Sequence, residues 1–316
     1  MTQQINQSAS GDWPDLPLGD WVDTCTTLHL WTQIVGKVRL AYAPMINHWW
    51  QVPLYVTCRG LTTSLIPHAG GSFQIDLDFI DHILKLQTSK GETEVMVLRA
   101  RTVADFYQEI MARLRALGLD THIWTMPVEI PDAIPFEQDS LHAAYDPEYA
   151  TRFWRILIQT DRVLNEFRAR FLGKVSPVHF FWGSFDMAVT RFSGRKAPRF
   201  NSASPNLGAW VMQEAYSHEV SSCGFWPGNG GFGEAAFYCY AYPEPQGFSA
   251  APVRPEQAFY DSQLGQFLLP YSELRRASSP DALLIDFLQT TYEAAANLAQ
   301  WDRASLERAN SSPTAR

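Results

Sequence analysis

The chain of 316 residues has no excess of basic charge. It carries 25 lysines and arginines against 33 aspartates and glutamates, so the net charge is −8 and the pI is near 5.5. Because binding to nucleic-acid phosphates needs a basic surface, this balance argues against a nucleic-acid partner. One stretch, 152–174, is rich in arginine, but acidic residues interrupt it, and we expect the solvated face of a helix there.

Cysteine is scarce, and long apolar runs are missing. The four cysteines lie far apart and include no Cys-x-x-Cys pair, which argues against a disulfide framework and against a zinc site. No run approaches the ~20 apolar residues of a membrane helix. The first 15 residues are polar and lack the apolar segment of a signal peptide. We therefore expect a cytoplasmic protein with no membrane partner. No pattern specifies a cofactor or an oligomeric state.

Common catalytic signatures are also missing from the chain. It contains no HExxH, HxH or GxSxG motif, and no HRD or DFG tripeptide. Residues 228–233 match GxGxxG, but a dinucleotide fingerprint must open a helix, whereas the residues after 235 are strand-like. We expect these glycines to form a hairpin turn.

Hydrophobic and aromatic residues are abundant. Hydrophobic residues make up 46% of the chain and charged residues 18%, a balance typical of a globular protein with a sizeable core. The chain holds 11 tryptophans, 19 phenylalanines and 12 tyrosines, and large rings either fill a core or line an apolar pocket.

Hydrophobic periodicity predicts an α+β protein. The first predicted helix begins near Asp20 and ends at Gly36, and Thr102 is the expected N-cap of the second. The predicted helices are 20–36, 102–117, 147–172, 210–216 and 281–298. The predicted strands are 38–42, 51–59, 73–79, 83–87, 94–98, 175–181, 185–192 and 235–242.

Short motifs recur in the same order in both halves. We infer two pseudo-symmetric halves, each a helix, antiparallel strands and a helix, packed as one compact unit, with a ligand site to be sought at their seam. The recurring motifs are Gly-Lys-Val at 36 and 173, Trp with Val-Thr at 49–57 and 182–190, Pro-x-x-Gly-Gly at 67 and 227, and Asp-Phe at 105 and 286. The predicted organisation is a flexible leader (1–18), a first repeat (19–125), a connector (126–147), a second repeat (148–302) with an insert at 195–217, and a disordered tail (303–316).

Two groups of residues are candidates for a site. A hairpin of 175–181 and 185–192 would bring His179 towards Asp186, with His218 and Glu219 opening the next segment. Two histidines and two carboxylates suit acid–base catalysis or metal binding, but also a structural hydrogen-bond network. In the first half, tandem tryptophans follow a histidine and form either a ligand wall or a packed corner. The catalytic candidates are His179, Asp186, His218 and Glu219, and the ligand-binding candidates are His48, Trp49, Trp50 and Trp182.

Four sequence blocks resemble those of a bacterial family described only as a domain of unknown function. The resemblance extends from about Leu16 to the closing helix. It implies a cytoplasmic bacterial protein whose whole length is one family unit, and it implies no activity and no catalytic residues. The blocks are residues 28–40 (LHLWTQIVGKVRL), 47–50 (NHWW), 176–186 (SPVHFFWGSFD) and 215–222 (AYSHEVSS).

Three functions fit these observations. The first is binding of, or catalysis on, a small organic molecule in an aromatic-lined cleft. The second is a metal-dependent hydrolase with His179, Asp186, His218 and Glu219 as ligands. The third is a structural or interaction protein whose aromatic rings all lie in its core.

Overall fold

The computed structural model describes residues 13–308. Its helices are α1 (Leu18–Tyr42), α2 (Val103–Ala116), α3 (Pro147–Ala169), α4 (Ala209–Ala215), α5 (Tyr271–Arg276), α6 (Pro280–Leu298) and α7 (Arg303–Leu306), with 3-10 turns η2 (Asn47–Trp49), η3 (Phe136–Gln138) and η4 (Phe248–Ala250). Its strands are β1 (Tyr55–Val56), β2 (Gly60–Thr62), β3 (Ile66–His68), β4 (Gly71–Asp78), β5 (Ile83–Thr88), β6 (Thr93–Val97), β7 (His179–Phe181), β8 (Asp186–Lys196), β9 (His218–Trp226), β10 (Ala236–Tyr242), β11 (Phe259–Asp261) and β12 (Gln266–Pro270).

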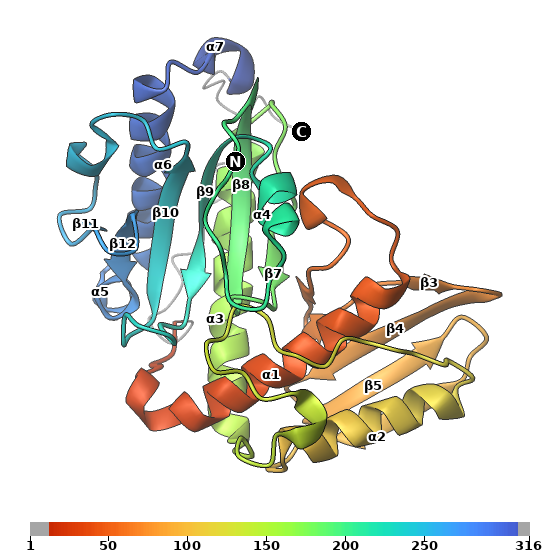
Figure 1. The fold of residues 1–316 in the computed structure, drawn as a ribbon. Coiled ribbons are helices and arrows are strands. Elements are labelled where there is room, and N and C mark those ends of the chain that lie inside the picture. Colours follow the sequence, from red (N-terminus) through yellow and green to blue (C-terminus); the bar gives the residue numbers. More distant parts are fainter. Residues whose placement is uncertain (1–12, 309–316) are drawn as a thin grey trace, which may run out of the picture.

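The strands of residues 13–308 form two antiparallel sheets of six strands, one in each half of the chain (Figure 1). The first sheet has the order β1-β2-β4-β5-β6. β2 pairs with the end of β4, and β3 pairs with its beginning. The second has the order β11-β12-β10-β9-β8-β7. The predicted α+β class is confirmed. Two antiparallel main-chain hydrogen bonds between Leu54 and Phe180 join the halves, and one hydrophobic core runs through both.

Helices cover one face of the second sheet and leave the other face to the site. Helices α3 and α6 pack against β8, β9 and β10, as Figure 1 shows. Side chains alternate along a strand. Val189, Cys223 and Phe225 belong to the core on the helix side, whereas Thr190 and Ser222 point to the opposite face and line a cavity. Helix α1 contacts α2, α3 and β3, so it touches both halves.

The first helix is longer than predicted. α1 continues through Gly36 to Tyr42, so the predicted helix end at Gly36 and the predicted strand 38–42 are wrong. Residues 27–38 are buried without interruption, which removes the 3.6-residue periodicity that marks a helix. Gly36 instead serves packing, because a Cβ there would lie 2.2 Å from the ring of Trp182. The glycine lets that ring lie directly on the helix.

The described part of the predicted leader is packed rather than loose. Trp13 is fully buried, and its indole nitrogen donates to Asp281 over 3.3 Å. Its ring also meets Phe237 and Tyr271 at 6.1 and 6.2 Å. Residues 1–12 and 309–316 lie outside the described residues. The predicted tail begins with α7 rather than with disordered chain.

The recurring motifs occupy different structural settings. Gly36 lies inside α1, whereas Gly173 follows the end of α3. Trp49 belongs to η2, whereas Trp182 lies in the turn between β7 and β8. The two Gly-Gly pairs do both lie in hairpins, β3–β4 and β9–β10. The internal duplication therefore stays a prediction that rests on element order rather than on these motifs.

Several other predicted elements agree with the structure, whereas only Tyr55–Val56 of the predicted strand 51–59 is a strand. The glycines at 228–233 form the β9–β10 turn and are followed by a strand, as expected. Thr102 accepts a hydrogen bond from the amide of Asp105 and caps α2. The insert carries α4, close to the predicted 210–216. The predicted strand 175–181 is shorter in the structure, where β7 begins at His179. Among residues 13–308, no helix has the length and apolar content to span a bilayer.

Candidate functional site

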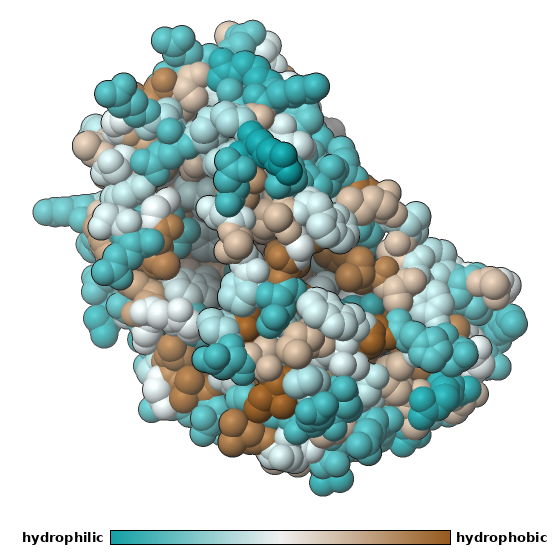
Figure 2. Space-filling model, in the orientation of Figure 1, coloured by the Kyte–Doolittle hydropathy of each residue, from teal (hydrophilic) through white to brown (hydrophobic). Residues whose placement is uncertain are grey.

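A cavity of about 540 Å³ lies where the halves meet, and we call it the central cavity. Apolar residues gather near the middle of the face drawn in Figure 2, where its two lobes join. The walls of the central cavity come from α1, η2, the connector, the β7–β8 hairpin, the insert, and strands β9 and β10. The aromatic side chains that line it are Trp49, Trp50, Trp124, Phe181, Trp182, Phe192, Trp210, Tyr216, Tyr238 and Tyr240.

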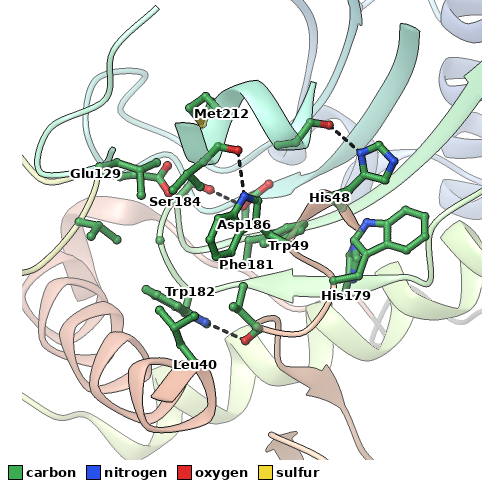
Figure 3. Close-up of a pocket in the computed structure, with 18 of the residues that line it drawn as sticks. Leu40, His48, Trp49, Glu129, His179, Phe181, Trp182, Ser184, Asp186 and Met212 are labelled. Atoms are coloured by element: carbon green, nitrogen blue, oxygen red, sulfur yellow. Dashed lines mark hydrogen bonds between the residues drawn. The ribbon is translucent and has the colours of Figure 1, made fainter. Parts of the chain in front are cut away.

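Two tryptophans are fixed as walls by hydrogen bonds to the main chain. The Trp182 indole donates to the carbonyl of Val52 over 2.9 Å, and that of Trp49 donates to the carbonyl of Val211 over 3.0 Å (Figure 3). The Trp49 ring also packs on Trp210 of α4, with centroids 4.9 Å apart. Trp210 is 63% exposed, and hydrogen bonds from His48 and Trp49 add to this ring contact in holding α4 over the cavity.

Two carboxyl groups, Glu129 and Asp186, lie on one side of the central cavity and form what we call the acid pair. Burial raises the pKa of Glu129 to about 7, and the negative charge of Asp186 adds to this. Within residues 13–308, the Glu129 carboxyl has neither a hydrogen-bond donor nor a basic partner. It lies against Gly183, where a Cβ would come within 2.2 Å of its Oε1.

Asp186 differs from Glu129 because it has donors. The Ser184 hydroxyl donates to its Oδ1 over 2.6 Å, and the Tyr238 hydroxyl donates to its Oδ2. These bonds favour the ionised carboxylate, while burial acts more strongly and raises the pKa of Asp186. Of the acid pair, Glu129 is therefore the group without support for its charge.

A glycine makes the Tyr238 bond possible. Tyr238 on β10 stands directly opposite Gly224 on β9. A Cβ on Gly224 would lie 2.6 Å from the Tyr238 hydroxyl oxygen, so the phenol lies across the glycine on its way to Asp186. Tyr240 and Tyr216 continue this polar row, with their hydroxyl oxygens 2.8 Å apart.

Helix α1 positions the acid pair through side chains one turn apart. The Gln33 amide binds both main-chain groups of Val128, at 2.8 and 2.9 Å, and thereby fixes the residue before Glu129. One turn earlier, His29 Nε2 lies 2.8 Å from the carbonyl of Gly183. Burial lowers the pKa of His29 to about 4, so its neutral ring donates this bond. Lys37, one turn later, donates to the Met126 carbonyl over 2.7 Å.

A second polar group lies at the side of the cavity opposite Glu129 (Figure 3). His48 Nδ1 lies 3.1 Å from the carbonyl of Ala215, so this nitrogen carries the proton. Its Nε2 then accepts from Lys174 Nζ at 2.7 Å. Burial and the charge of Lys174 lower the pKa of His48. His218 contacts the His48 ring edge-on, with centroids 5.8 Å apart.

His179 lines the same side of the cavity but makes no contact with Asp186. It is 1% exposed, and its Nδ1 has no hydrogen-bond partner among the described residues. Its neighbours are the rings of Trp50, Tyr55 and Phe181. Burial, with Arg39 and Arg168 beyond these rings, lowers the pKa of His179 to about 3. It is a neutral group in an apolar wall.

Six of the eight predicted site residues line the central cavity: His48, Trp49, Trp50, His179, Trp182 and Asp186. His218 is not among the lining residues. Glu219 points to the other face of the sheet, where it pairs with Arg195 at 2.7 Å and with the Ser193 hydroxyl at 2.8 Å. The four catalytic candidates are therefore not gathered into one group. Among residues 13–308, no three His, Cys, Asp or Glu side chains are placed to hold one metal ion.

The sequence prediction missed Glu129, Lys37 and the tyrosines of β10. Glu129 lies in the proline-rich connector, where no periodicity indicates which side chains are buried. The position of Lys37 within an apolar run does indicate a buried lysine, although the prediction did not use it. Burial lowers its pKa to about 8, and its ammonium group lies 4.7 Å from the centre of the Trp124 ring.

Left-handed backbone recurs around the cavity. The φ angles of His48, Trp49, Glu129 and Asn206, which line it, are 59°, 63°, 60° and 54°. Phe185, between Ser184 and Asp186, has a φ of 60°. An L-residue in this region costs on the order of 1 kcal/mol or more, so the surrounding contacts must hold these turns in place.

Comparisons with known proteins give a family but no activity. Neither the curated proteins nor the solved structures include a significant match to this chain. The model of one family, described as a family of unknown function (DUF5996), matches residues 13–308. These residues include both sheets and every wall of the central cavity. The chain thus belongs to the DUF5996 family.

Proposed function

We propose that this protein binds a small, largely apolar organic molecule in the central cavity. The observation that carries the proposal is a cavity of about 540 Å³ that combines aromatic walls with an unpartnered carboxyl group at Glu129. Small-molecule sites are typically concave and apolar, with a few polar groups that orient the ligand. A scaffold whose aromatic rings all lie in a filled core would leave no such space.

Two further observations support a binding site. The cavity lies at the seam of the halves, so it is built from segments far apart in sequence. Non-glycine residues with left-handed backbone are gathered around it, and such residues are frequent at ligand sites.

We also expect the protein to act in the cytoplasm, since its four cysteines are free.

Acid–base catalysis on the bound molecule is a second candidate function. The acid pair favours it, because Asp186 has two donors to its carboxylate and Glu129 has none among the described residues. Two neighbouring acids in unequal environments are typical of acid–base sites. A carboxyl with a pKa near 7 exchanges protons readily at neutral pH.

Filling the cavity tests the binding proposal. Ala188 lies on its floor, and Ala188→Phe would occupy part of the space. We expect neutral aromatic probes to stabilise the wild-type protein saturably in thermal unfolding, and this stabilisation to be lost in the variant. The matched control is Ala116→Phe at the exposed end of α2. Equal stabilisation of A188F and wild type by the probes would contradict binding in this cavity.

A further inference from the structure

Among the described residues the acid pair lacks a positive partner, whereas arginines pair with several other carboxylates. Arg59, Arg101, Arg113 and Arg303 each contact two carboxylates or one half-buried carboxylate. Within residues 13–308, no Arg, Lys or His side chain forms an ion pair with either member of the acid pair. Two carboxyl groups in an apolar cavity are costly to ionise without such a partner.

The two lysines at the cavity, Lys37 and Lys174, are already engaged elsewhere. Lys37 donates to the Met126 carbonyl and lies against the Trp124 ring. Lys174, near the opposite wall, donates to His48 and lies over the rings of Trp50 and Phe192. Neither ammonium group neutralises the acid pair.

The rings beside the acid pair suit a positive charge. Tyr216 lies near enough to both carboxyl groups for their negative charge to raise its pKa. Tyr238 donates to Asp186, and Tyr240 stacks on Tyr238 and shares a hydrogen bond with Tyr216. The three phenols therefore remain neutral, and their ring faces carry partial negative charge. Organic ammonium groups bind to such combinations of aromatic faces and carboxylates.

The cavity wall also contains a second polar atom whose contact is unmade. His179 is 1% exposed and lines the opposite wall, and its Nδ1 has no partner among the described residues. Buried polar atoms are normally satisfied. This atom is closed off from the cavity by its neighbours, so the unmade contact that a bound molecule would complete is that of the Glu129 carboxyl.

We propose that the ligand is an organic amine whose ammonium group lies between Glu129 and Asp186 and whose apolar part packs among the aromatic rings. This inference rests on the proposed function and adds the chemical class of the ligand. The ammonium group supplies the charge that the acid pair lacks. Binding shifts Glu129 to its ionised form, so the complex releases a proton when it forms near or below neutral pH.

Three probes of similar size separate this inference from simple apolar binding. They share a phenyl ring on a short chain and differ in the end group: 2-phenylethylamine, 2-phenylethanol and 3-phenylpropanoate. Their affinities are measured by titration calorimetry with the full chain at pH 7. We expect the amine to bind about tenfold or more tightly than the alcohol, and the carboxylate to bind weakest. At pH 6.5, the heat of amine binding should vary with the ionisation enthalpy of the buffer.

Variants of single acids complete the test. Glu129→Gln should reduce amine affinity about tenfold and alcohol affinity much less, while its thermal unfolding shows that it folds. Glu219→Gln, an acid on the other face of the sheet, is the matched control and should keep wild-type affinities. If the alcohol or the carboxylate binds as tightly as the amine, the amine inference is overturned and the binding site stands. If none of the three probes binds, both proposals fail.

Discussion

Replacement of Glu129 by glutamine should change how the stability of the protein depends on pH. The pKa of Glu129 is raised from an ordinary value of 4.5 to about 7 in the folded protein. Between these two values the folded state holds a proton that the unfolded state releases. The free energy of unfolding therefore falls as pH rises from about 4.5 to about 7, and it changes no further for this residue above that range. The glutamine variant lacks this dependence.

The expected magnitude follows from the two pKa values. One pKa unit corresponds to about 1.4 kcal/mol, so ionisation of Glu129 costs the folded state about 3 kcal/mol above pH 7. This is an upper figure, because the carboxyl opens into a cavity that admits water. The variant and the wild type should be similarly stable near pH 4.5. By pH 8 the variant should be more stable by as much as about 3 kcal/mol.

Urea unfolding followed by tryptophan fluorescence measures this difference. Curves recorded at several pH values between 4.5 and 8, without ligand, give the free energy of unfolding for each protein. Glu256→Gln, at an exposed position, is the matched control and should follow the wild type throughout. If the stabilities of Glu129→Gln and wild type stay parallel across this range, then Glu129 is not held with a raised pKa, and the electrostatic basis of the acid pair is wrong.

Three further predictions concern the walls of the cavity. Gly36→Ala should destabilise the protein by ~1–3 kcal/mol in urea unfolding, because its Cβ would meet the Trp182 ring at 2.2 Å; an unchanged midpoint would contradict that packing. Trp210→Ala should speed proteolytic cleavage within the insert, since α4 loses the ring contact between Trp210 and Trp49 and is then held to η2 by hydrogen bonds alone. Mass spectrometry of the fragments checks this, and equal cleavage rates would refute it. His179 should stay neutral from pH 8 to pH 4 in NMR titration, because burial lowers its pKa to about 3; a titration midpoint above 5 would show that the ring is solvated.

The elements that could be predicted are those with one exposed face. Residues 73–79 alternate between apolar and polar side chains, and all but Phe79 lie in β4. The apolar stripe of α2 and its Thr102 cap predicted both ends of that helix to within one residue. α1 is the opposite case. Its middle is buried on all sides, so the sequence shows no apolar periodicity there from which the end of the helix could be predicted.

The candidate site divides in a similar way. Trp182 and Asp186 could be found from their local surroundings, because they stand in a short polar and aromatic segment between two predicted strands. Glu129 could not, since its place in the cavity depends on Gln33, which precedes Val128 by 95 positions. The same limit applies to His218 and Glu219. They are adjacent in sequence, but alternation along β9 sends them to different faces of the sheet.

The three α1 side chains at 29, 33 and 37 set the positions of two cavity walls relative to each other. Each lies one helical turn from the next, and together they fix the hairpin turn at Gly183 and the connector at Val128 and Met126. A one-residue insertion in this part of α1 would rotate the later side chains by about 100° and detach the connector. On the proposed binding function, relatives with other ligands should differ by substitutions in the lining, while the length of this helical segment stays constant.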